Sequence, residues 1–287
     1  MIELQHVTYT YPGGERPALR DVTLEIPAGQ FCAVIGANGA GKSTLAYTLA
    51  GFVPHFFHGV LSGTVRVANR PTQITPLSDL VSVVGLVSQN PFNQISGTKF
   101  TVREEVAFGL ENLGVPRVEM LERVAAAMRL VGIENLADRS PLALSGGQMQ
   151  RLALAAVLAM QPQVLVVDEP TSQLDPVGSR EVFAALRALA EQQRVTVVMI
   201  EHKLEWVAAF AERVIALADG AVVADGTPAA VLTAEALSAL GVGQTRFTQA
   251  ARQARGAGGW PVQRPLPVTL DEAVAGFAAG SREPRPA

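Results

Sequence analysis

A short glycine-rich stretch of this chain has the residue types and spacing of a phosphate-binding loop. Residues 36–44 read GANGAGKST and fit G-x-x-x-x-G-K-[ST] at every fixed position, between an apolar run and a run typical of a helix. Glycines allow positive φ, so backbone N–H groups and a helix N-terminus can face phosphate oxygens. The alternative is a turn that carries Lys-Ser by chance. The context favours a nucleoside triphosphate site made of Gly36, Asn38, Gly39, Ala40, Gly41, Lys42, Ser43 and Thr44.

Metal-binding and catalytic groups are expected beside the same phosphates. The loop pattern assigns Lys42 to the β- and γ-phosphates and Ser43 to Mg²⁺. Asp168 and Glu169 follow Val164–Val167, a continuous apolar run typical of a central parallel strand. Because ligands bind at such strand ends, we expect Asp168 to hold Mg²⁺, directly or through water, and Glu169 to polarise the attacking water. Taken alone, the pair would be two solvated acids.

Two further segments are candidate phosphate-binding groups, although their residue types alone do not establish that function. The apolar run Val195–Ile200 ends in Glu201-His202, and an imidazole at that strand end can donate to the γ-phosphate. Ser145, Gly146, Gly147 and Gln148 precede the Ala/Leu-rich helix expected over 149–160. Free N–H groups, a hydroxyl and the helix dipole make this a second anion site. Taken singly, His202 would be a surface histidine and Ser145 an ordinary N-cap.

Strand patterns surround these residues. The run Ile2–Tyr11 alternates, with Leu4, His6 and Thr8 on one face and Val7, Tyr9 and Tyr11 on the other. With Leu19–Ile26 it predicts an antiparallel β entry to the phosphate-binding strand, and 61–67 and 81–87 are predicted as further strands. Tyr11 offers a ring on which an adenine can stack, although an aromatic packed on a sheet face is the alternative.

The residues between Gln89 and Leu144 are predicted to be mostly helical. A capping box, Thr101 to Glu104, begins a helix that reaches Leu113, and a second helix is expected over 118–130. The helical pattern interrupts an otherwise α/β sequence. This insert therefore offers a surface that can dock a partner.

Composition excludes several classes of function. The net charge is −3, so there is no basic field for nucleic acid. The single cysteine, Cys32, allows no disulfide within the chain and is expected to be a small core residue in a reducing compartment. The N-terminus resembles no secretory signal, and the longest uncharged stretch, 152–167, falls short of the ~20 apolar residues that span a bilayer. Any action at a membrane would need another polypeptide to span it.

Taken together, the motifs resemble an ABC-type ATPase domain. Seven elements of such a domain occur here in the same order and spacing. They are the adenine-stacking aromatic (Tyr11), Walker A (Gly36–Thr44), the Q-loop (Gln89), the signature (Leu144–Gln148), Walker B (Val164–Glu169), the D-loop (Ser172–Asp175) and the switch histidine (His202). The resemblance implies an α/β fold of P-loop NTPase type. It would have an antiparallel β subdomain, a RecA-like parallel-sheet core, a helical insert at about 90–145 and a short C-terminal appendage.

The resemblance also implies how two such chains work together. ATP would lie between Walker A of one subunit and Ser145, Gly146, Gly147 and Gln148 of the other. Gln89 would sense the γ-phosphate or Mg²⁺ and move with the helical insert, while Asp175 acts across the dimer. ATP binding would then close the dimer and hydrolysis would reopen it.

Finer features resemble the ATPase subunits of energy-coupling factor (ECF) importers for vitamins and metal ions. They are the segments 89–94 (QNPFNQ), 101–112 (TVREEVAFGLEN) and 201–206 (EHKLEW). The resemblance implies a second ATPase, a transmembrane subunit, a substrate-binding membrane component and a place at the cytoplasmic face of the membrane. Ser88 and Gln173 depart from the commoner residues. The alternatives are another ABC importer, an exporter, or a soluble ABC ATPase. The sequence lacks the long heptads and the second ATPase unit that are typical of the soluble ABC ATPases.

The C-terminal part differs in composition from the ATPase domain, which we place at 1–240. Residues beyond Leu240 are rich in Gly, Ala, Arg and Pro, and 241–259 is predicted to be a linker. A capping box from Thr269 to Glu272 predicts a short helix with Leu270, Val274 and Phe277 on an apolar face. That face would dock on its own domain or on the partner ATPase, and 281–287 is expected to fray.

Overall fold

A six-stranded sheet forms the centre of the computed structural model, which describes residues 1–280. The expected frayed segment, 281–287, lies outside the described residues. The strand order is β10-β9-β3-β8-β7-β6, and only β10 runs antiparallel to its neighbour. The bounds are β3 (Phe31–Gly36), β6 (Val84–Val87), β7 (Val164–Asp168), β8 (Thr196–Ile200), β9 (Arg213–Ala218) and β10 (Ala221–Gly226). Residues 81–83, expected in a strand, form a turn before β6.

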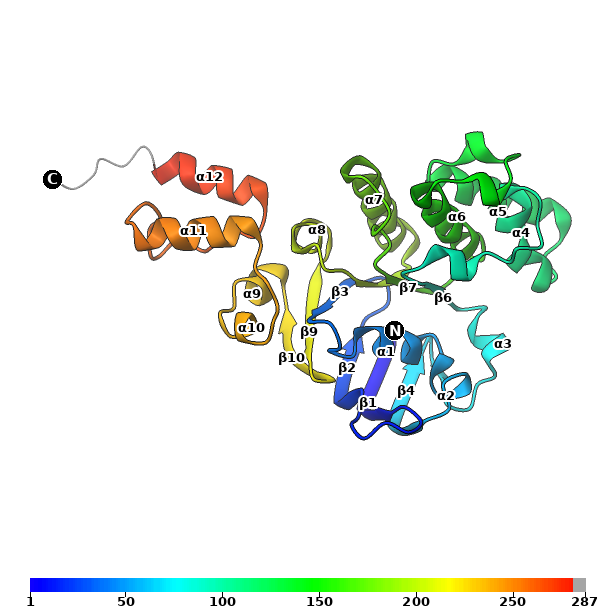
Figure 1. Cartoon of the computed structure of the whole chain (residues 1–287), viewed down its shortest axis with the longest axis horizontal. Helices are drawn as coiled ribbons and strands as arrows, with labels where there is room; N and C mark the ends of the chain where they lie inside the picture. The colour runs from blue at the N-terminus through cyan, green and yellow to red at the C-terminus, as the bar shows by residue number, and fades with distance from the viewer. Residues whose placement is uncertain (281–287) are drawn as a thin grey trace.

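The parallel strands are mostly apolar because both faces of this sheet are covered. Alternate residues of one strand enter different cores: Cys32 and Val34 pack with the antiparallel sheet, and Phe31 and Ala33 pack with the helices of the other face. The first core includes α1 (Lys42–Leu49), and the second includes α6 (Gly146–Ala159), α7 (Pro176–Gln193) and α8 (Leu204–Phe210). Figure 1 shows these layers.

The antiparallel sheet has the strand order β2-β1-β4-β5. Its strands are β1 (Ile2–Thr10), β2 (Leu19–Ile26), β4 (Val60–Val67) and β5 (Arg70–Pro71). The predicted faces of β1 were wrong, because Leu4 and Val7 are both buried. A bulge at His6, whose φ is 51°, shifts the register between them and turns both side chains inward.

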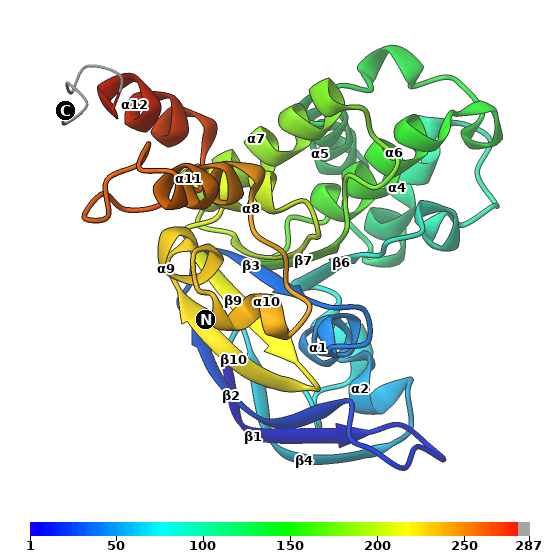
Figure 2. The same ribbon diagram turned by 60° about the vertical axis from the view of Figure 1, so that its left-hand side comes forward.

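The helical insert lies on the far side of the central sheet from the antiparallel sheet (Figure 2). It contains α4 (Val102–Asn112) and α5 (Arg117–Leu130), with short 3₁₀ turns η1 (Pro91–Gln94), η2 (Glu134–Leu136) and η3 (Pro141–Ala143). The predicted capping box is confirmed, because the Thr101 hydroxyl accepts from the backbone of Glu104 while the Glu104 carboxylate accepts from the backbone of Thr101. The short helix α2 (Phe52–His55) lies between α1 and β4, and α3 (Leu77–Leu80) lies between β5 and β6.

The C-terminal part is more ordered than its composition predicted. It contains α9 (Pro228–Leu232), α10 (Ala236–Ala239), α11 (Arg246–Gly256) and α12 (Leu270–Gly280). The expected linker is wrong over α11, where Thr245 caps a run of Ala, Gln and Arg, all good helix formers. The capping box of α12 is confirmed. Figure 1 shows α11 and α12 side by side, apart from the antiparallel sheet.

The apolar face predicted for α12 does not form a buried seam. Leu270 and Val274 are exposed, and Ala273 is buried instead. Trp260 packs where Gly276 has no side chain, and its ring meets Phe277 edge-on at 5.0 Å. Among residues 1–280, no helix is long and apolar enough to cross a membrane.

Candidate functional site

The glycine-rich loop joins β3 to α1, as predicted. Gly39 and Gly41 have φ of 80° and 100°, and Gly41 is the residue that precedes the first turn of α1. Lys42 is buried, and its ammonium donates to the carbonyl oxygens of Gly36 (3.0 Å) and Ala37 (2.9 Å). Burial lowers the pKa of Lys42, while the carboxylates of Asp168 and Glu169 oppose that shift. The lysine thus lies within the loop with its charge directed at backbone oxygens.

The structure joins Ser43 to Asp168 across the sheet. The Ser43 hydroxyl donates to Oδ2 of Asp168 over 2.9 Å, which links the start of α1 to the end of β7. Burial raises the pKa of Asp168, and the hydrogen bond from Ser43 opposes this. A hydroxyl and a carboxylate are hard oxygen ligands of the kind that Mg²⁺ prefers, so the two residues fit that ion together with phosphate oxygens.

Glu169 lies between two other predicted catalytic residues. Its Oε2 accepts from Nε2 of Gln89 at 2.9 Å, and its Oε1 lies 3.1 Å from Nε2 of His202. Glu169 has φ of 49°, an unusual conformation for a residue other than glycine, immediately after β7. The three side chains come from the ends of β6, β7 and β8, three neighbouring parallel strands. A carboxylate held by an amide and an imidazole is well placed to orient and deprotonate a water.

Tyr11 belongs to an aromatic cluster beside α1. Its hydroxyl lies 3.2 Å from that of Thr44, and its ring meets Tyr9 (4.9 Å) and Phe57 (5.8 Å) edge-on. Sequence analysis missed Phe57, although the aromatic-rich run that follows Gly51 was the available signal. The contacts agree with the packed alternative and leave adenine stacking a prediction.

The signature and D-loop residues contact each other within one chain. Ser145 caps α6 in a capping box with Gln148, and Gly146 lies against the side chain of Gln173. Asp175 caps α7, because its Oδ1 accepts from the backbone N–H of Gly178 at 2.7 Å. Both helix N-termini are therefore capped internally. Sequence analysis also missed the buried acid Glu201, whose signal was its place at the end of an apolar strand.

Comparison with known proteins decides the family. The family model for the ABC transporter matches residues 19–172. The chain belongs to the ABC transporter ATP-binding family. It is 42% identical over 243 residues to a putative ABC transporter ATP-binding protein of Pyrococcus abyssi, a match that spans 84% of this chain and 86% of that one.

Further relatives refine this placement. The chain is 44% identical over 233 residues to the energy-coupling factor transporter ATP-binding protein EcfA1 of Lacticaseibacillus paracasei, covering 81% of each chain. It superposes with a TM-score of 0.73 and 30% identity on cbiO1 from Clostridium perfringens, described as part of the transporter complex cbiONQ, covering 88% and 94%. The dimeric post-hydrolysis cassette MJ0796 with ADP and Pi gives a TM-score of 0.70 at 31% identity, covering 79% and 99%. The expected ABC ATPase fold is confirmed, and ATP hydrolysis is the activity of this family.

Proposed function

We propose that this chain is the ATP-hydrolysing subunit of an ECF-type importer for a vitamin or metal ion. The observation that carries the hydrolytic part is the placement of Glu169 between Gln89 and His202, beside the Ser43–Asp168 pair. Relatives named as ECF ATP-binding proteins support the importer type. The proposal places the chain at the cytoplasmic face of the membrane, bound to other subunits.

The residues divide the chemistry among them. Glu169 accepts the proton of the attacking water, while Gln89 and His202 orient Glu169 and then contact the γ-phosphate. Ser43 and Asp168 would hold Mg²⁺, which neutralises charge on the phosphate oxygens when bound. The ammonium of Lys42 leaves the loop carbonyls for the phosphates. Its lowered pKa follows from burial, which also strengthens its attraction to a bound anion.

In this proposal, a second ATPase subunit completes the nucleotide site. The N-terminus of α6 carries Ser145 and two glycines with backbone N–H groups available to an anion. A partner chain would present these groups to the nucleotide held by Lys42, and Asp175 would act across the same interface. Closure would then depend on ATP, and opening on its hydrolysis.

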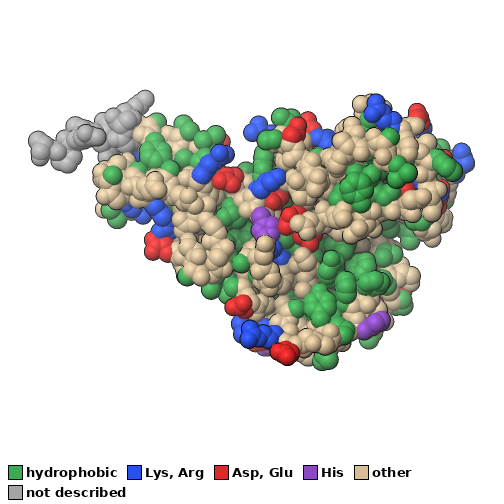
Figure 3. Space-filling view, viewed as in Figure 1, with side chains coloured by type: hydrophobic (Ala, Val, Ile, Leu, Met, Phe, Trp, Pro, Cys, Tyr) green, Lys and Arg blue, Asp and Glu red, His purple; other side chains and the backbone are tan. Residues whose placement is uncertain are grey.

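The helical insert offers the docking surface for a transmembrane subunit. Phe92 and Phe100 are 60% and 85% exposed, and Figure 3 shows hydrophobic side chains gathered over the insert at the upper right. Exposed apolar patches of this kind mark interaction sites. The surface lies close in sequence to Gln89, since Phe92 is part of η1.

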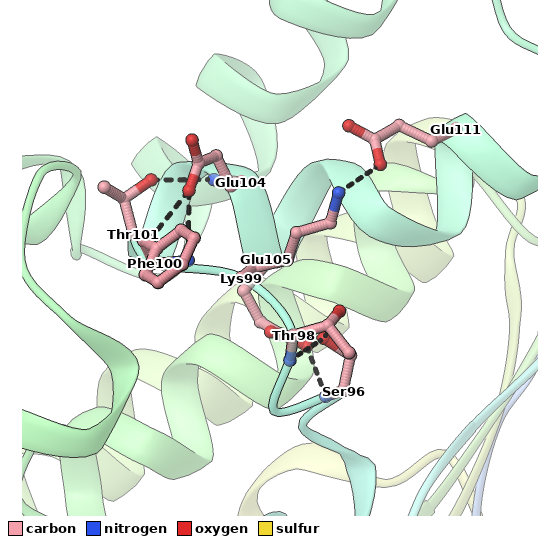
Figure 4. A network of polar contacts seen from close by, with 8 residues as sticks. All are labelled: Ser96, Thr98, Lys99, Phe100, Thr101, Glu104, Glu105 and Glu111. Carbon is pink, nitrogen blue, oxygen red and sulfur yellow. Dashed lines mark hydrogen bonds and ion pairs between the residues drawn. The ribbon is translucent and has the colours of Figure 1, made fainter.

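Internal hydrogen bonds tie this surface to the nucleotide site. The amide of Gln94 donates to the carbonyl of Leu86 and accepts from the N–H of Ser88, so η1 is fastened to the end of β6. The buried carboxylate of Glu105 accepts from both the N–H (2.6 Å) and hydroxyl (2.8 Å) of Ser96, which fixes the loop that carries Phe100 to α4 (Figure 4). Movement of Gln89 would therefore reach the docking surface through short, bonded segments.

Affinity purification from detergent-solubilised membranes tests the proposal. We expect the tagged chain to recover a second ATPase and a polytopic membrane protein. Phe100→Asp should lose the membrane protein, while Ile74→Asp, a change at a residue that is 79% exposed outside the insert, should keep it. A chain found only in the soluble fraction, alone or on ribosomes or DNA, would keep the ATPase chemistry and overturn the importer. Equal loss with both variants would refute the docking surface.

A further inference from the structure

A buried carboxylate next to His202 has no role in the chemistry described so far. Glu201 follows β8 and is 3% exposed. Among residues 1–280, no arginine or lysine side chain forms a direct ion pair with it. Its Oε1 instead accepts from the backbone N–H groups of His202 (2.8 Å) and Lys203 (3.0 Å), and its Oε2 accepts from the hydroxyl of Thr171 (2.9 Å). A buried charge is retained only where hydrogen bonds compensate its desolvation, so these bonds hold the segment in place.

Thr171 brings the segment after β7 into the same cluster. It is fully buried and stands two residues after Glu169 and one before Ser172, where the D-loop begins. Its carbonyl oxygen and its hydroxyl accept from the ammonium of Lys203, at 3.0 and 3.4 Å. Lysine can only donate and an ionised carboxylate can only accept, so the direction of the Thr171 hydroxyl proton is fixed toward Glu201. These hydrogen bonds join the segment after β7 to the segment after β8.

We propose that Glu201 is a positioning residue for ATP hydrolysis. Its Oε1 holds the backbone N–H of His202, so that the imidazole meets Glu169, and its Oε2, bonded to Thr171, joins the segment before the D-loop to the switch histidine. This inference rests on the proposed roles of Glu169 and His202. A D-loop displaced by a partner subunit would move Thr171 and with it the carboxylate that accepts from the His202 N–H. The cluster therefore gives the D-loop a direct mechanical path to the catalytic imidazole.

Removal of the Thr171 hydroxyl tests its hydrogen bond to Glu201 with little change in side-chain volume. Thr171→Val takes the proton donor from Glu201 and leaves the nucleotide-binding residues untouched. We expect kcat of the full-length chain to fall about 10- to 100-fold with KM for ATP changed less than about twofold, since small misplacements of catalytic groups cost this much. Thr171→Ser keeps the hydroxyl and should restore kcat to within about threefold of wild type.

Thr196→Val is the matched control. Thr196 is also buried, and its hydroxyl accepts from the N–H of Gly29 at 3.0 Å, at the opposite end of β8 from Glu201. The Thr196→Val variant loses one partly buried hydrogen bond far from the site. We expect its kcat to stay within about twofold of wild type, because the lost bond touches neither catalytic loop. Equal losses of kcat in Thr171→Val and Thr196→Val would overturn the inference.

A double-mutant cycle asks whether the cluster acts through the histidine. In a His202→Ala background, measured by single turnover, Thr171→Val should slow the reaction by less than about twofold, because the group that it positions is gone. The same 10- to 100-fold loss in both backgrounds would overturn the proposal. If Glu169→Gln and His202→Ala leave turnover unchanged, the site assignment itself fails. If they slow it while Thr171→Val does not, only the present inference fails.

Discussion

Two glycines of the phosphate loop differ in their surroundings, and that difference predicts their tolerance to alanine. Gly39 and Gly41 both have left-handed φ, 80° and 100°, so a methyl group costs each about 1–2 kcal/mol in backbone strain. Around Gly39 no atom lies within 4 Å of an added Cβ. At Gly41 the added Cβ would lie 2.5 Å from the carbonyl oxygen of Ala18, short of the ~3.3–3.6 Å at which carbon and carbonyl oxygen meet.

The contact at Gly41 adds the cost of overpacking. The methyl group would also lie 3.3 Å from Cα of Gly220, whose N–H donates to the carbonyl of Ala40, so the neighbouring turn cannot retreat freely. Overpacking of this kind costs about 1–3 kcal/mol, which comes on top of the strain that both variants share. At roughly 2–4 °C per kcal/mol, Gly41→Ala should melt about 2–12 °C below Gly39→Ala.

Thermal unfolding of the two variants without nucleotide is the assay. The comparison cancels the strain and the loss of glycine flexibility in the unfolded chain, since both substitutions are glycine to alanine. The difference that remains reports the close approach of the loop to Ala18 and Gly220. Equal melting temperatures would refute the packing of the phosphate loop against these two turns.

Three further predictions concern the charged residues of the site. Glu169→Gln should keep ATP affinity and lower turnover about 10²- to 10⁴-fold, and unchanged turnover would remove Glu169 as the base. Lys42→Ala should weaken ATP binding by about tenfold or more in a titration, because charge-assisted bonds to phosphate are lost. Burial raises the pKa of Asp168 in the folded chain. Between the unfolded and folded pKa values, the folded chain therefore binds more protons than the unfolded chain. The free energy of unfolding that this group contributes then falls as pH rises through that interval. Without Mg²⁺, Asp168→Asn should therefore be more stable than wild type at neutral pH, and a lower free energy of unfolding in denaturant titration would contradict the reasoning.

Local patterns were sufficient where the local backbone decides the structure. The apolar run Val164–Val167 predicted a buried strand, and the capping boxes at Thr101 and Thr269 predicted where two helices begin. The placement of Asp168 and His202 at neighbouring strand ends followed from the parallel topology. The buried strand and the two helix starts depend on residues within one or two turns, which a sequence shows directly.

Features that depend on distant contacts or on competing signals were not predicted. The bulge at His6 reverses one face of β1, and alternation alone cannot reveal an inserted residue. Glycine and arginine content suggested a linker over α11, although its Ala and Gln residues have high helix propensity. Trp260 packs against Gly276 of α12, 16 residues further along the chain, while Leu270 stays exposed. The predicted roles of the site residues remain predictions.

The polar groups of the site are paired with one another, and this shapes what a nucleotide must do. Lys42 is bonded to loop carbonyls, Ser43 to Asp168, and Glu169 to both Gln89 and His202. A triphosphate that recruits Lys42 and His202 would exchange bonds inside the chain for bonds to phosphate, so only the difference between the two sets contributes to affinity. The γ-phosphate, by drawing His202 and Gln89 away, would free Glu169 to accept a proton from water. On this proposal the base becomes competent only when the substrate is complete, which couples binding to catalysis without a separate switch.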